Sequence, residues 1–177
     1  MKKVNVVVSL LFVGLVTSAV SAQENLTLKK GQAGIMVVGK SVYDGLTPDD
    51  DVRVGEKENV IEIFMGGKRV MVLEVKVETF IALDYVVKTI TVSDKRFRTE
   101  LGIGVGSTLA GIRAKYADAQ LEKTADGRQV ATVGELSMYF WVEQVKSPSR
   151  SLLVLGRDTD STEYSDQDLK VTSVTVF

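Results

Sequence analysis

The segment from Arg69 to Glu78 alternates apolar and polar residues with a period of two, and this pattern constrains the fold more than any other feature of the chain. From Met71 onward, side chains of one parity are apolar, whereas most of the others are charged. Such alternation predicts a strand of antiparallel sheet with one face toward a core and the other toward solvent. The apolar residues of this parity are Met71, Leu73, Val75 and Val77.

Two hairpins are predicted from glycine-containing turns between apolar runs. Gly66-Gly67 separates a run over Val60–Phe64 from the alternating segment, which predicts a hairpin over residues 59–78. Asp126-Gly127 predicts a second hairpin with a type I′ turn, because these residue types accept positive φ angles. The strands of this second hairpin and the remaining predicted strands are Gln120–Lys123, Gln129–Val133, Ser137–Val142, Ser151–Leu155 and Leu169–Phe177.

One stretch has the spacing of a helix. Leu109, Ile112 and Tyr116 recur at i, i+3 and i+7, and Ser107 is placed to cap the helix N-terminus. The predicted fold class is therefore α+β, predominantly antiparallel β-sheet with one or two short helices.

An internal repeat is predicted from two pairs of similar segments. Gly34–Val42 resembles Gly102–Leu109, and Asp84–Val92 resembles Asp168–Val176. Chance similarity among strands rich in valine and threonine is the alternative explanation. A duplication would give two related α+β halves within one compact unit, a first half over residues 23–93 and a second over residues 94–177.

In the first of these halves, the helix after the glycine motif is expected to last about one turn, because Gly45 and Pro48 interrupt it.

The first 22 residues have the pattern of an export signal. Lys2 and Lys3 precede an apolar run over residues 4–20, and Ser21-Ala22 offers a cleavage site before Gln23. Cleavage there would deliver a chain without a transmembrane segment to the periplasm or the medium. The alternative is an uncleaved membrane anchor, because the run of 17 residues reaches the lower limit of the ~17–25 residues that span a bilayer.

Composition excludes several classes of function. The chain contains neither cysteine nor histidine, so thiol nucleophiles, Ser-His-Asp triads and ordinary zinc or copper sites are excluded. The 22 basic and 23 acidic residues nearly balance, which gives no attraction to nucleic acid. Without disulfides, the folded state depends on packing.

The acidic residues suggest two kinds of chemistry. A loop over residues 158–168 carries weak calcium candidates, although the glycine of an EF-hand loop is missing, so a solvated loop is the alternative. Two facing carboxylates could also hydrolyse glycosides, because that reaction needs no histidine, but the sequence assigns no catalytic residue. The sequence therefore predicts no required cofactor. The calcium candidates in the loop over residues 158–168 are Asp158, Asp160, Asp166 and Asp168.

The strand over Ser137–Val142 is rich in aromatic residues and carries the only tryptophan of the chain. Tyr139 and Trp141 share one face of this strand, opposite Met138, Phe140 and Val142. Tyr139 and Trp141 either enter the core or form a rigid binding anchor for a protein or sugar ligand.

The pattern Thr99–Thr108, followed by a short helix, an Asp-Gly hairpin, an aromatic strand and a final Val-Thr-Ser-Val-Thr-Val strand, resembles uncharacterised exported β-rich proteins of Gram-negative bacteria. The resemblance covers residues 97–177 and implies no activity, because these families are known as domains of unknown function. The architecture is also similar to tandem α+β inhibitor and outer-membrane-assembly modules.

Together these features predict a non-catalytic binding or protein-interaction module of the cell envelope, with an envelope protein or a glycan as its partner. The alternative is a carboxylate-dependent hydrolase that acts on envelope polysaccharide.

Overall fold

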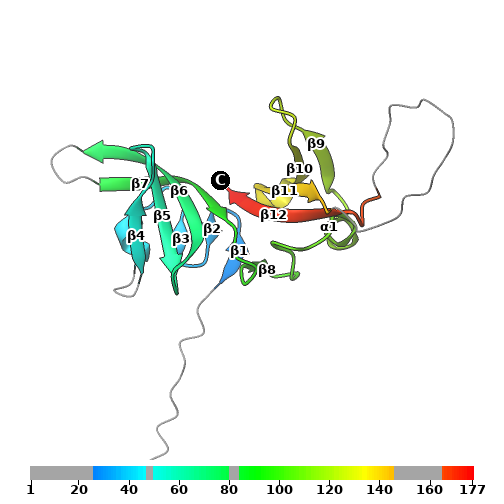
Figure 1. Ribbon diagram of the computed structural model, residues 1–177, viewed down its shortest axis with the longest axis horizontal. Coiled ribbons are helices and arrows are strands. Elements are labelled where there is room, and N and C mark those ends of the chain that lie inside the picture. Colours follow the sequence, from blue (N-terminus) through cyan, green and yellow to red (C-terminus); the bar gives the residue numbers. More distant parts are fainter. Residues whose placement is uncertain (1–25, 47–49, 80–83, 146–164) are drawn as a thin grey trace, which may run out of the picture.

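The structure, a computed structural model, describes residues 26–46, 50–79, 84–145 and 165–177 (Figure 1). These residues form mostly strands, with a single α-helix, α1 (Leu109–Lys115), and two 3-10 turns, η1 (Val42–Gly45) and η2 (Gly134–Leu136). The strands are β1 (Thr27–Lys29), β2 (Gln32–Ala33), β3 (Met36–Val37), β4 (Asp51–Val54), β5 (Val60–Met65), β6 (Lys68–Thr79), β7 (Asp84–Val92), β8 (Arg98–Thr99), β9 (Gln120–Lys123), β10 (Gln129–Val133), β11 (Met138–Gln144) and β12 (Leu169–Val176).

Eight strands form one antiparallel sheet in the order β4-β5-β6-β7-β12-β11-β10-β9. Each side of this sheet is a meander of strands that follow one another in the chain. The two meanders meet where β7 pairs with β12, near the C-terminus in Figure 1. The prediction of a mainly antiparallel sheet with a short helix is confirmed.

A smaller sheet covers part of one face of the large sheet. Its order is β3-β2-β1-β8, and β1 pairs with β8 in parallel. One apolar cluster joins this small sheet, η1 and α1 to the large sheet. Its most completely buried members include Leu28, Leu73, Ile90, Phe97 and Phe140.

Both predicted hairpins are present, but the second turn differs from the prediction. Gly66 and Gly67 have φ of 56° and 74°, as a two-residue turn between β5 and β6 requires. In the second hairpin only Gly127 has positive φ, at 84°, and its N–H donates to the Thr124 carbonyl at 2.8 Å. The predicted type I′ turn is therefore wrong, because the strands are joined by the five residues 124–128.

The helix N-cap is Thr108 rather than the predicted Ser107. The Thr108 hydroxyl accepts a hydrogen bond from the Gly111 N–H at 3.0 Å. The Ser107 hydroxyl instead accepts from the Gly104 N–H and from Arg98 Nη1, both at 3.1 Å. The cap is the extended residue that directly precedes the helix, so the hydroxyl one position earlier serves the preceding loop.

The predicted inward face of α1 and the predicted short helix interrupted at Gly45 are confirmed. Leu109, Ile112 and Tyr116 are 0%, 0% and 5% exposed. The 3-10 turn η1 is a single turn that ends at Gly45. Tyr116 lies just beyond α1, and its hydroxyl donates to the buried Thr99 hydroxyl at 2.9 Å.

Two predicted segments lie outside the described residues, namely the export signal over residues 1–22 and the strand over 151–155. Within the ranges that the structure does describe, no helix is long and apolar enough to cross a bilayer.

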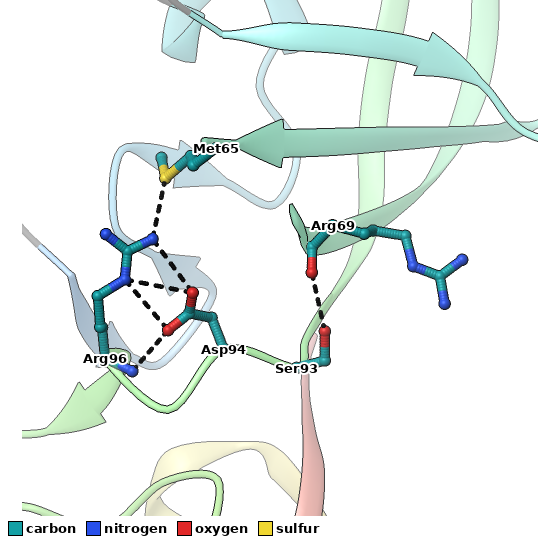
Figure 2. Close-up of polar contacts among 5 residues, drawn as sticks. All are labelled: Met65, Arg69, Ser93, Asp94 and Arg96. Atoms are coloured by element: carbon teal, nitrogen blue, oxygen red, sulfur yellow. Dashed lines mark hydrogen bonds and ion pairs between the residues drawn. The ribbon is translucent and has the colours of Figure 1, made fainter. Parts of the chain in front are cut away.

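The connection from β7 to β8 is held by a local ion pair (Figure 2). The Asp94 carboxylate accepts hydrogen bonds from the Arg96 backbone N–H at 2.8 Å and from Arg96 Nη2 at 3.1 Å. Arg96 Nη2 also approaches the Met65 sulfur at 3.7 Å, and the Ser93 hydroxyl donates to the Arg69 carbonyl. These contacts tie the connection to the end of the β5–β6 hairpin.

Replacing Asp94 with asparagine is expected to make folding less sensitive to acid. Burial acts to raise the pKa of Asp94, but the hydrogen bonds from Arg96 outweigh it and lower this pKa below its ordinary value. A depressed pKa in the folded state stabilises the fold above the unfolded pKa of ~3.9, and this stability is lost as pH falls through the folded pKa. Urea midpoints between about pH 6 and pH 2 measure the effect.

In this experiment the midpoint of the unsubstituted protein should fall more steeply with acid than that of Asp94→Asn. Glu100→Gln is the matched control, because the Glu100 side chain is 74% exposed, against 18% for Asp94. Parallel acid profiles for Asp94→Asn and the unsubstituted protein would contradict the prediction.

Candidate functional site

Strand β11 turns its two kinds of residues to opposite faces of the large sheet. Met138, Phe140 and Val142 are at most 3% exposed and belong to the core cluster. Tyr139 and Trp141 point to the other face, where Tyr139 is 39% exposed and Trp141 is partly buried. The predicted alternation is confirmed, and the structure places Tyr139 and Trp141 on the outer face rather than in the core.

Tyr139 and Trp141 are joined on this face by Phe177, and we refer to these three residues as the aromatic cluster. The rings of Tyr139 and Trp141 meet edge to face with centroids 6.1 Å apart, and those of Tyr139 and Phe177 do so at 4.6 Å. Phe177 is 41% exposed. Edge-to-face packing of this kind adds about 0.5–1.5 kcal/mol per pair.

Hydrogen bonds fix the orientation of the Trp141 ring. Its Nε1 donates to the Thr175 hydroxyl at 2.9 Å, and that hydroxyl is also 2.9 Å from the hydroxyl of Thr91 on β7. The indole polar atom is therefore satisfied by the sheet. A ring held in this way contacts a ligand with little further loss of conformational entropy.

Arg128 lies over the Trp141 ring, with its guanidinium carbon 4.1 Å from the ring centroid. Arg128 Nε donates to the Asp126 carboxylate at 2.7 Å, and the Thr124 hydroxyl donates to the same carboxylate. The hydrogen bonds from Thr124 and Arg128 lower the pKa of Asp126, so this carboxylate stays charged near neutral pH. The β9–β10 turn thus holds a cation against the tryptophan.

A groove of about 350 Å³ opens beside Trp141 and Arg128. Charged, amide and hydroxyl groups surround the aromatic wall, which suits contacts with a polar or charged partner rather than an apolar small molecule. The groove is lined by Lys123, Gly127, Arg128, Gln129, Trp141, Val142, Glu143, Gln144, Thr172 and Ser173.

Sequence reasoning found Tyr139 and Trp141 but missed Arg128 and Phe177. The register of β10 against β11 pairs Gln129 with Val142, which places Arg128 beside the end of the aromatic strand. The sequence signal that could have indicated Arg128 is its position immediately after Asp126-Gly127. Phe177 follows β12, whose pairing with β11 only the tertiary structure provides.

Two of the four calcium candidates, Asp166 and Asp168, lie within the described residues. Asp158 and Asp160 lie outside the described residues. Asp166 forms an ion pair with Arg113 of α1, and Asp168 is exposed just before β12. Among the residues that the structure describes, no group of three or more acidic side chains is arranged to hold a metal ion.

Within the part of the chain that the structure describes, the aspartates with a shifted pKa lack the raised pKa that the general acid of a glycosidase needs. Hydrogen bonding to Arg53 lowers the pKa of Asp51, and Asp94 and Asp126 are likewise lowered, as described above. A general acid in glycoside hydrolysis needs a raised pKa. Each of these three aspartates instead pairs with the arginine two residues later.

Fold and site together define an antiparallel β protein with an aromatic cluster on the solvent face of its sheet. No protein-family model matches the chain, and no curated protein matches it. Among solved structures, it is similar to the uncharacterised protein yfeY from Escherichia coli, with a TM-score of 0.48 and 14% sequence identity, over 84% of this chain and 98% of that one. The resemblance of residues 97–177 to uncharacterised exported proteins of Gram-negative bacteria stays a prediction.

Proposed function

We propose that this protein is a non-catalytic interaction module of the cell envelope, exported to the periplasm or the medium, and that it binds a protein partner through the aromatic cluster and Arg128. Tryptophan, tyrosine and arginine are the residue types that most often dominate the energy of protein–protein interfaces. Here they gather on one exposed sheet face beside a groove.

A comparison between the two sides of the large sheet supports this proposal. We propose that residues 23–93 and 94–177 are duplicated halves. Thr91 on β7 pairs with Thr175 on β12, and these two residues, 84 positions apart, occupy the same place in the repeated segments. A two-fold axis that relates the halves would pass between Thr91 and Thr175.

Two further features recur at corresponding places. The ladder of β6 against β7 is irregular between Glu74 and Val75, and that of β11 against β12 is irregular between Trp141 and Val142. In both ladders the irregularity falls three residues after a methionine. Met71 lies opposite Val92 at the end of β7, and Met138 lies opposite Val176 at the end of β12; β7 and β12 are the two central strands of the sheet.

The glycine motifs also recur against these central strands. The N–H of Gly39 donates to the Val87 carbonyl at 2.8 Å, and that of Gly106 donates to the Val171 carbonyl at 2.7 Å. Both glycines have positive φ, 81° and 89°. Superposition of residues 26–92 on residues 94–177 in this register tests the duplication.

When Met71 is matched with Met138, Val72 and Glu74 of the first half occupy the places of Tyr139 and Trp141. Strand β6 thus forms the same geometry with no aromatic residue of its own. We infer that the fold does not require Tyr139 and Trp141, and this single observation carries the assignment of the aromatic cluster to binding.

The test is photocrosslinking from Glu143, which lines the groove, in cells that export the protein. A photoreactive phenylalanine analogue at Glu143 is expected to give a covalent adduct with one protein. The matched control places the analogue at Lys76, the corresponding exposed position in the first half, where no such adduct is expected. Intact mass of the crosslinking protein should show a chain that begins at Gln23.

A second variant separates binding from folding. Arg128→Glu combined with Tyr139→Val introduces the residue types of Glu58 and Val72, which occupy the corresponding places in the first half, so the sheet should form normally. Loss of two hot-spot side chains is expected to reduce the adduct roughly thirtyfold or more. Equal adducts at both positions, or binding only to a glycan panel, would contradict the proposal, and cleavage of those glycans would favour the hydrolase.

A further inference from the structure

Strand β4 is an exposed edge of the large sheet that carries apolar side chains. It stands at one end of the strand order, and all four of its residues are exposed. Val52 and Val54 are 39% and 73% exposed, although the residues that they oppose on β5, Ile63 and Ile61, are 2% and 6% exposed. Exposed apolar edges of this kind are sites for pairing with another strand.

The ladder to β5 determines which backbone groups of β4 are free. The N–H of Gly55 donates to the carbonyl of Val60 at 2.8 Å, and these residues lie opposite each other one step beyond the Val54–Ile61 pair. Hydrogen-bonded and non-hydrogen-bonded pairs alternate in an antiparallel ladder. Arg53 therefore bonds to β5, whereas Val52 and Val54 direct their N–H and C=O groups away from it.

We propose that β4 pairs antiparallel with β4 of a second copy of this chain, about a two-fold axis at Val52. Outward backbone groups occur only at alternate residues, so an axis at Arg53 is excluded because its groups already face β5. An axis at Val54 would place Arg53 opposite Gly55 of the second copy, where it has no carboxylate partner. With the axis at Val52, this valine opposes Val52 of the second copy in a hydrogen-bonded pair.

The charges of β4 complement one another in this register. Asp51 of each copy lies opposite Arg53 of the other, in the non-hydrogen-bonded pairs where cross-strand side chains are closest. Within one chain, Arg53 Nη2 is already 2.6 Å from the Asp51 carboxylate on the same face. Pairing of two copies would build a four-charge ladder across the dimer axis.

The apolar face of β4 is extended across the dimer axis by the same arrangement. A cavity of about 110 Å³ lies beside Val52, Val54 and the 60% exposed Tyr43. This volume is below the ~300 Å³ of ordinary small-molecule pockets, so it suits a side chain rather than a ligand. In the dimer, Val52 of the second copy extends this face, and Val54 lies opposite Asp50.

The opposite edge of the sheet, strand β9, has no exposed apolar side chain. Strand β9 carries Gln120, Glu122 and Lys123, and its only apolar residue, Leu121, is partly buried. Exposed apolar side chains on an edge strand favour strand addition, and β4 has them whereas β9 does not. The pairing is thus assigned to β4 and not to β9.

Sedimentation velocity of the purified protein tests the pairing. The mass is expected to rise from one chain to two between roughly 10 µM and 1 mM, the range of a small interface. Asp51→Arg and Arg53→Asp each place like charges opposite each other twice, and each should raise the dimer dissociation constant about tenfold or more.

Mixing these two variants is the decisive measurement. One chain then presents two basic residues to two acidic residues of the other, so a heterodimer should form with an affinity near that of the unsubstituted protein. Glu122→Lys on β9 is the control and should leave the dimer unchanged, and circular dichroism verifies folding of every variant. A single-chain mass up to 1 mM, failure of the mixture to associate, or loss of the dimer in the control would overturn the proposal.

Discussion

Replacing Phe140 with alanine is expected to destabilise the fold by about 3–5 kcal/mol, because the substitution leaves a large cavity in the core. Phe140 is 0% exposed and lies between Ala131 of β10 and Val174 of β12. Small domains are stable by only about 5–15 kcal/mol in total, so this loss would lower the urea midpoint severely. Denaturant unfolding followed by circular dichroism measures the change.

The control for this prediction is the adjacent residue of the same strand. Tyr139→Ala removes a ring from the outer face, where it packs edge to face on Phe177, and should cost roughly 1 kcal/mol. Similar losses for the two substitutions would show that β11 is not divided between a core face and a solvent face.

Replacing Gly104 with alanine is expected to cost about 3 kcal/mol, because a Cβ at this position would meet backbone. The added carbon would lie 2.2 Å from the Phe97 carbonyl oxygen and 3.0 Å from Arg98 Cδ. Phe97 is buried in the core at 1% exposure, so its backbone cannot withdraw without disturbing packing. Thermal and urea unfolding should both show the loss.

Gly102 provides a matched control in the same loop. Its φ is 80°, but nothing lies within 4 Å of a Cβ built there. Gly102→Ala should therefore cost only the backbone strain of a left-handed residue, about 1 kcal/mol. If Gly104→Ala were as mild as Gly102→Ala, the close approach between residues 97 and 104 would not exist in solution.

Local features of the fold were predictable because they depend on neighbouring residues. The alternation in β6 and the Gly66-Gly67 turn gave the first hairpin with nearly its observed bounds. The helix spacing gave α1, although its cap moved by one residue to Thr108. The second turn was misassigned because Asp-Gly also occurs in longer connections, in which only the glycine needs positive φ.

Long-range pairings were not predictable in this way. The pairing of β7 with β12 and the parallel pairing of β1 with β8 join segments far apart in the chain, and no local pattern specifies them. They arise because each strand must satisfy its backbone hydrogen bonds and bury its apolar face against whichever surface remains.

The sequence by itself determined that Tyr139 and Trp141 share one face of a strand, because side chains alternate along extended backbone. Only the tertiary structure decided which face meets the core, because that depends on where the small sheet and α1 pack. It also placed Arg128 over Trp141, since that contact requires the β10–β11 register. Periodicity is a property of one segment, whereas burial depends on the segments that cover it.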